Sequence, residues 1–176
     1  AGLPKRLPGL ALGVFSLLLL LAGCAQTPGS EGASPYEALV EDLKAGAPRW
    51  DELDPTFLAS ADRNERLSRR PALRGRALRS GAEGERSRLK AALERLGLYY
   101  GDMDAHAQAF RAALSLEGAE AATHHRSALQ ALENRIAASG NGTPEAPYAV
   151  LTAQDAFDWL RQRKIATVGA LYQGDD

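Results

Sequence analysis

The sequence predicts an all-α protein, a small helical domain of about five or six helices built from antiparallel hairpins. Residues 24–176 are rich in Ala, Leu, Arg and Glu, which favour helices, and they contain few β-branched residues. Alternation of apolar and polar residues, which is typical of half-buried strands, is scarce. These 153 residues suffice for one domain of ordinary size.

The amino-terminal segment has the pattern of a targeting signal. Lys5 and Arg6 precede an apolar run over residues 10–22. The run is shorter than the roughly 20 apolar residues that a membrane-spanning helix needs, but it has the length of a signal-peptide core. We therefore expect residues 1–23 to be a signal peptide.

The end of this run resembles the lipobox of bacterial lipoproteins. Its sequence is Leu21-Ala22-Gly23-Cys24, and Cys24 is the only cysteine of the chain, so no intrachain disulfide can form. The resemblance implies that Cys24 receives a diacylglyceryl group and further acyl chains such as palmitate. It also implies that signal peptidase II recognises Leu21, Ala22 and Gly23 and cuts before Cys24.

The residues after the cysteine suggest where the lipid would hold the protein. Ala25, in place of Asp, implies by the same resemblance the periplasmic face of the outer membrane. Residues 24–35 are rich in Pro, Gly and Ser, and they predict a flexible tether with a reach of roughly 20 Å. The helical domain, expected over 36–172 with a tail at 173–176, would then act close to a membrane.

Apolar periodicity and capping signals place the helices. Asp54 followed by Pro55 predicts an N-cap and a helix start. Pro71 predicts the end of that helix or the start of the next one, and glycines weaken the segment from there to residue 85. Residues 140–148 predict a loop, and Thr152 with Asp155 resembles a capping box. The expected helices cover about 36–45, 54–67, 85–100, 104–117, 120–139 and 152–164.

Residues 93–116 resemble part of a tetratricopeptide repeat, a helix–turn–helix unit used in protein binding. Gly101-Asp102 falls at the turn of that family, and Phe110, Ala113 and Leu114 follow at its spacing. Leu96-Gly97 and Tyr100 come about three residues later than the family pattern places them. There is no second repeat, although proteins of this family usually stack at least three repeats to bury a continuous core.

No residue pattern predicts catalysis, a cofactor or a metal site. His124 and His125 are adjacent, so on a helix they point about 100° apart and cannot easily hold one ion, even with His106 nearby. His125 shares a stripe with Leu129 and Leu132, which favours a packed or interface role. The chain lacks a nucleophile elbow and a phosphate-binding loop, so we expect a protein that is not an enzyme; a wall-modifying enzyme is the weakest hypothesis.

Charge is distributed unevenly. The segment 63–90 holds ten basic and three acidic residues, whereas the rest of the chain after residue 23 holds nine basic and nineteen acidic residues. One interpretation is a solvated helix face with paired charges. The other is attraction to lipid headgroups, lipopolysaccharide, cell-wall polymer or an acidic partner.

These observations predict a lipid-anchored, non-catalytic helical adaptor or assembly factor for an envelope protein complex. The alternative is a module that binds an anionic surface through the basic segment. Nucleic acid is not an expected partner for an exported lipoprotein. The residues expected to contact a partner or surface are Arg69, Arg70, Arg74, Arg76, Arg79, Tyr99, Tyr100, Phe110 and Trp159.

Overall fold

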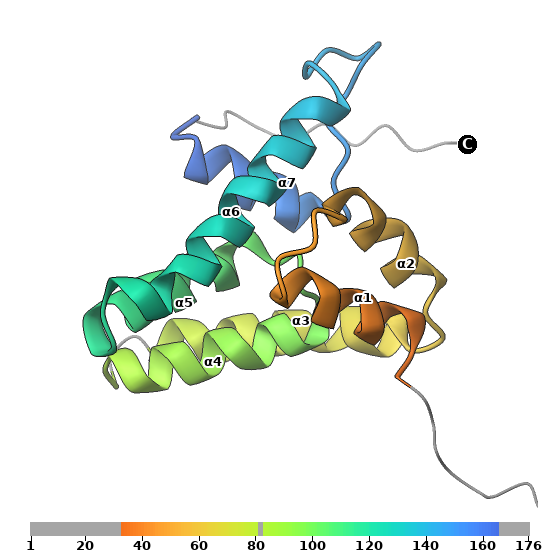
Figure 1. Cartoon of the computed structure of the whole chain (residues 1–176). Coiled ribbons are helices and arrows are strands. Elements are labelled where there is room, and N and C mark those ends of the chain that lie inside the picture. Colours follow the sequence, from red (N-terminus) through yellow and green to blue (C-terminus); the bar gives the residue numbers. More distant parts are fainter. Residues whose placement is uncertain (1–32, 81–82, 166–176) are drawn as a thin grey trace, which may run out of the picture. The chain divides into compact units, whose positions relative to one another are not determined.

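The computed structural model describes residues 33–80 and 83–165, and this part of the chain is helical, as predicted (Figure 1). It contains no strand among these residues, only an isolated bridge between Thr143 and Ala146. The described elements are α1 (Pro35–Lys44), a 3-10 turn η1 (Trp50–Glu52), α2 (Leu53–Ala59), α3 (Arg63–Ser80), α4 (Glu85–Leu98), α5 (Met103–Leu116), α6 (Ala119–Ser139) and α7 (Ala153–Gln162).

Helix α1 begins at Pro35, one residue before its expected start. The Ser34 side chain accepts a hydrogen bond from the Glu37 backbone N–H, and the Glu37 carboxylate accepts one from the Ser34 N–H, which completes a capping box. Pro35 occupies the first helical turn, where its missing N–H costs nothing. The expected signal peptide, Cys24 and most of the expected tether lie outside the described residues, as does the expected tail at 173–176.

The prediction for residues 54–85 was wrong in two respects. Asp54 is not an N-cap, because α2 already begins at Leu53, directly after η1. The chain then breaks at residues 60–62, and α3 runs without interruption from Arg63 to Ser80 with Pro71 inside it. This additional helix explains why the described residues hold seven α-helices where about six were expected.

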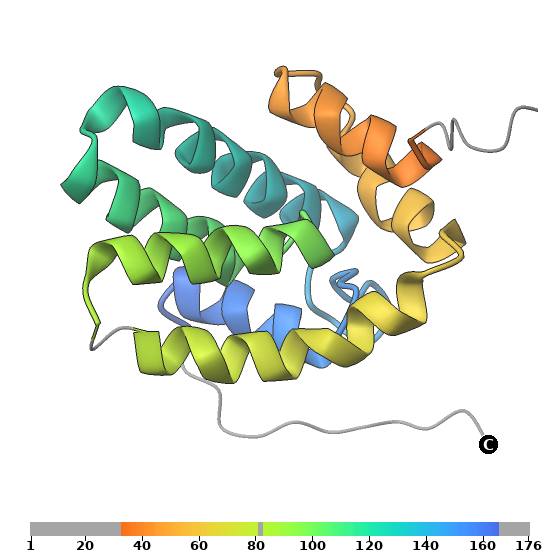
Figure 2. The same ribbon diagram turned by 90° about the horizontal axis from the view of Figure 1, so that it is seen from below.

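Helix α3 packs against α4, α4 against α5 and α5 against α6, and Figure 2 shows α3 and α4 side by side and antiparallel. Tyr36, Leu53, Phe57, Met103 and Leu132 are among the buried residues of the core between α1, α2 and these helices. Periodicity misplaced part of this core. Leu93 is 48% exposed and Leu114 is 44% exposed, whereas alanines of both helices, such as Ala92 and Ala109, are buried.

Helix α7 returns to this assembly after the predicted loop. The Thr152 side chain accepts a hydrogen bond from the Asp155 N–H, so the predicted cap is confirmed. Trp159 of α7 is buried against Tyr148, and α7 also packs against α5. Among the described residues, no helix combines the length and apolarity that crossing a membrane requires.

Pro71 provides a test of the uninterrupted α3. An interior proline removes one intrahelical hydrogen bond and costs about 3 kcal/mol relative to alanine. We expect Pro71→Ala to raise the free energy of unfolding in urea by about 1–3 kcal/mol, because alanine restores the N–H donor at an exposed position. Ser68→Ala, also exposed on α3, is the control and should change stability by less than about 0.5 kcal/mol. A loss of stability in Pro71→Ala would contradict the continuous helix.

Candidate functional site

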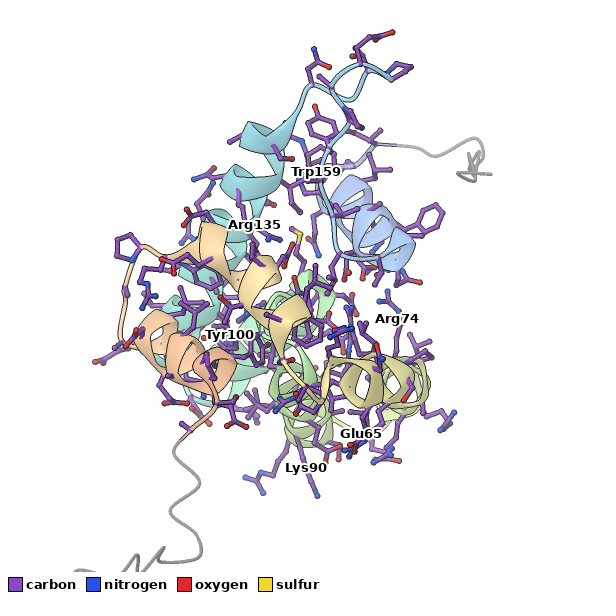
Figure 3. The ribbon with its side chains drawn as sticks, turned by 90° about the vertical axis from the view of Figure 1, so that its right-hand side faces the viewer. Glu65, Arg74, Lys90, Tyr100, Arg135 and Trp159 are labelled. Carbon is purple, nitrogen blue, oxygen red and sulfur yellow. The ribbon has the colours of Figure 1, made fainter. Side chains whose placement is uncertain are left out.

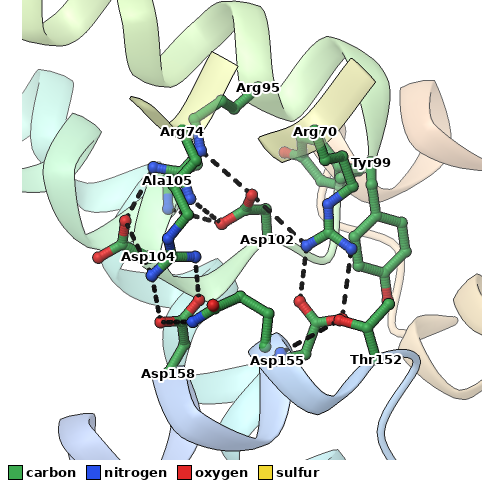
Figure 4. Close-up of polar contacts among 12 residues, drawn as sticks. Arg70, Arg74, Arg95, Tyr99, Asp102, Asp104, Ala105, Thr152, Asp155 and Asp158 are labelled. Atoms are coloured by element: carbon green, nitrogen blue, oxygen red, sulfur yellow. Dashed lines mark hydrogen bonds and ion pairs between the residues drawn. The ribbon is translucent and has the colours of Figure 1, made fainter. Parts of the chain in front are cut away.

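Four arginines and four aspartates form a largely buried ion-pair network between α3, α4, α5 and α7 (Figure 4). At its centre Arg95, only 1% exposed, donates to Asp102 across 2.7 Å and to Asp104 across 2.8 Å. Asp102 also caps α5 by accepting from the Ala105 N–H. The end of α4 and the start of α5 are therefore held at a fixed angle by charge.

The same network fastens α7. Arg70 donates to Asp155 across 2.6 Å, and the two guanidinium nitrogens of Arg74 each lie 2.6 Å from an oxygen of Asp158. Figure 3 shows Arg74 between α3 and α7. Arg161 of α7 adds a bond to Asp104. Burial raises the pKa of Asp104, but Arg95, Arg74 and Arg161 outweigh it and leave that pKa below its usual value.

The turn between α4 and α5 places an aromatic residue beside α1. The Tyr100 N–H donates to the Tyr36 hydroxyl across 2.8 Å, and the Tyr100 ring stacks on Trp50. Gly101 permits this turn, because a Cβ there would lie 2.4 Å from the Tyr99 hydroxyl oxygen. Tyr100 thus becomes part of the wall of a groove.

The groove lies between α1, the end of α4 and the start of α6, and its volume is about 570 Å³. Val40, Leu93 and Leu96 supply aliphatic lining, and Tyr36 and Tyr100 supply aromatic lining. Its charged residues are paired with one another, Glu37 with Arg66 across 3.1 Å and Glu41 with Lys44 across 2.7 Å. The groove is therefore an apolar hollow with a rim close to electrical neutrality.

Three histidines line or support this groove. His124 and His125 line it, and His106 lies behind them, fully buried. His106 Nδ1 is 3.1 Å from His125 Nδ1, its Nε2 is 2.8 Å from the Tyr100 carbonyl oxygen, and His124 Nε2 bonds to the Tyr100 hydroxyl. Burial lowers the pKa of His106 to about 3 and that of His125 to about 4, with the neighbouring histidines adding to both shifts. Both rings are neutral at physiological pH.

Six of the ten basic residues in segment 63–90 form ion pairs within the chain. Arg70 and Arg74 belong to the buried network, so the prediction that they contact an external surface was wrong. Arg69 and Arg76 are exposed but paired with Glu65 and Glu94, and Arg79 is exposed without an ion pair among the described residues. The other paired members are Arg66 and Arg88.

The aromatic residues expected as partner anchors are mostly internal. Tyr99 is 1% exposed, packs against Phe57 and donates its hydroxyl hydrogen to Asp54; Trp159 is 2% exposed. These two predictions of surface anchors were wrong, because both side chains fill the core. Tyr100 borders the groove through a nearly covered ring, and Phe110 is half-buried outside it.

Sequence reasoning missed the aspartates of the ion-pair network and the groove that the histidines line. No sequence pattern singled out Asp158, yet it is 1% exposed. A signal was available: Arg70 and Arg74 lie four residues apart, and Asp155 and Asp158 three apart, so each pair shares one helix face. His125 packs as predicted, but its place in a groove depends on α1, which is distant in sequence.

Comparisons with known proteins add no relative: no protein-family model, no curated protein and no solved structure matches the chain. Among the described residues, no group of three or more His, Cys, Asp or Glu side chains is arranged to hold a metal ion.

Arg95 tests the ion-pair network. Removal of one partner from a buried pair leaves uncompensated charge and costs about 3–5 kcal/mol. We expect Arg95→Met to lower the free energy of unfolding by that amount, because Asp102 and Asp104 lose their most buried partner. Arg69→Met breaks an exposed pair and should cost less than about 1 kcal/mol. Equal losses in the two variants, measured in urea, would count against the network.

The buried histidines predict a dependence of stability on pH. Their folded-state pKa values lie below the unfolded value of 6.5, so the unfolded chain binds more protons between pH 6.5 and about 4. The free energy of unfolding should therefore fall as the pH drops through this window, by about 1.4 kcal/mol per pH unit for each histidine.

His106→Gln is the matched variant for this experiment, since glutamine keeps a donor at the Nε2 position but does not titrate. Urea unfolding between pH 7 and pH 5 should show a shallower slope in this variant, because only His125 and His124, whose pKa values burial also lowers, still titrate. An unchanged slope would exclude His106 as one of the titrating groups.

Proposed function

We propose that this protein is a lipid-anchored, non-catalytic helical adaptor that binds a segment of a partner protein in the groove between α1, α4 and α6. The observation that carries this proposal is the groove itself, an apolar hollow of about 570 Å³ with internally paired rim charges. Grooves between helices that expose aliphatic side chains are typical sites for amphipathic segments.

The exposed side chain of Leu93 supports a binding role. It lines the groove yet is 48% exposed, so a partner would remove apolar surface from water there. Burial of one such side chain favours association by about 1.5–3 kcal/mol. The basic segment supports the alternative function less, because six of its ten charges already have acidic partners.

The proposed anchor gives the groove a location. The lipobox resemblance places the lipid on Cys24, eleven residues before α1 begins at Pro35. Because α1 forms one wall of the groove, the groove would work within roughly 20 Å of the tethering membrane if the intervening residues are flexible. A partner is therefore expected in the same envelope compartment, within reach of the membrane.

Photo-crosslinking tests the groove. A photoreactive residue in place of Lys44, on the groove rim, should crosslink one partner in cells, with adducts mapping to one segment of it. Leu93→Glu in the same protein should reduce the yield at least about tenfold, because a carboxylate would be buried against the partner.

Leu78→Glu is the control, since Leu78 is 74% exposed on α3 and does not line the groove. Its crosslinking yield should stay within about twofold of the parent protein, given that exposed substitutions usually have small effects. Undiminished crosslinking in Leu93→Glu, or an equal loss in both variants, would overturn the proposed function.

A further inference from the structure

The hydrogen bonds around His106 define which nitrogen atoms carry protons. The carbonyl oxygen of Tyr100 can only accept, so His106 Nε2, 2.8 Å away, must be the donor. A neutral imidazole has one N–H, and burial keeps His106 neutral, so His106 Nδ1 is an acceptor. The hydrogen in the contact between the two Nδ1 atoms therefore belongs to His125.

The same reasoning leaves one nitrogen of His125 without a proton or a partner. With its hydrogen on Nδ1, the neutral ring presents Nε2 as a bare acceptor. This atom makes no hydrogen bond within the described residues, and it is not among the enclosed atoms that lack one, which belong to Glu85, Arg135 and Trp159. His125 is 91% buried and lines the groove, so its free nitrogen borders the groove space.

We propose that His125 Nε2 is the recognition acceptor of the groove, and that the partner segment fills the groove with a tryptophan whose indole N–H donates to it. This inference rests on the proposed function, which assigns the groove to a protein partner. The His125 ring is held in this tautomer by its hydrogen bond to His106, which in turn donates to the Tyr100 carbonyl oxygen.

Two features of the groove select this side chain. Its aliphatic and aromatic lining favours a large apolar group. A neutral donor suits the groove better than a cationic one, because the acidic residues of its rim, Glu37 and Glu41, are already paired with Arg66 and Lys44. Indole is apolar, neutral and a donor without acceptor capacity, so it meets both conditions.

The test uses two peptide probes that differ in one atom. The first is an acetylated Ala-Trp-Ala amide, and the second carries benzothienylalanine, in which sulfur replaces the indole N–H. Amide shifts of the isotope-labelled full chain give both affinities. The tryptophan probe should shift residues around Leu93 and His125, and the sulfur probe should bind about tenfold more weakly, since it leaves the buried acceptor unpaired.

Two variants of His125 separate recognition from packing. His125→Asn keeps a donor toward His106 but lacks an acceptor at the Nε2 position, so it should bind the two probes equally. His125→Gln carries an amide oxygen near that position and should keep the preference for tryptophan. The response of His125→Gln also keeps the experiment decisive if His125→Asn folds poorly.

Each result decides the inference separately from the proposed function. Equal binding of the two probes to the parent protein, or a tryptophan preference that survives in His125→Asn, would overturn the role of His125. Absence of tryptophan-probe binding would also overturn it. The groove's role in binding a partner is decided by the Lys44 crosslinks, which depend on neither probe.

Discussion

Arg95 is the charge on which the arrangement of α3, α4, α5 and α7 depends. A guanidinium that is 1% exposed is tolerable only with acidic partners, and Asp102 and Asp104 provide them from the first residues of the next helix. Those aspartates are in turn near Arg70 and Arg74, which hold α7. Helices that meet only through apolar side chains can shift relative to one another by small amounts. Buried ion pairs form in one relative position of the helices, so the network determines which helix faces meet.

The network also determines the geometry of the groove. By joining the end of α4 to the start of α5, it fixes the turn that carries Tyr100. Tyr100 then contacts α1 through Tyr36, α5 through His106 and α6 through His124. A groove lined by helices distant in sequence is thus supported by one turn. Such support from buried neighbours is what keeps a recognition side chain in a defined orientation.

The fold class and the cap of α7 could be predicted because they depend on local signals. Thr152 caps its helix by a bond to a residue three positions away, and composition together with the scarcity of alternating apolar residues indicated a helical protein. Pro71 misled the prediction because tertiary contacts on either side of it, made by Arg70 and Arg74 with α7, hold the helix together despite the missing bond. The groove and the ion-pair network could not be predicted in the same way, since they bring together residues far apart in the sequence, such as Arg70 and Asp155, which are separated by 85 positions.

The position of the acidic partners has a consequence for the order of events during synthesis. Arg70 and Arg74 are made early, whereas Asp155 and Asp158 lie in the last described helix. A chain interrupted before α7 would lack the closest counter-charges of these arginines, and burying them without those partners is costly. Burial of Arg70 and Arg74 therefore waits until α7 has been made, and a chain that ended before it would stay open there, where proteases can remove it.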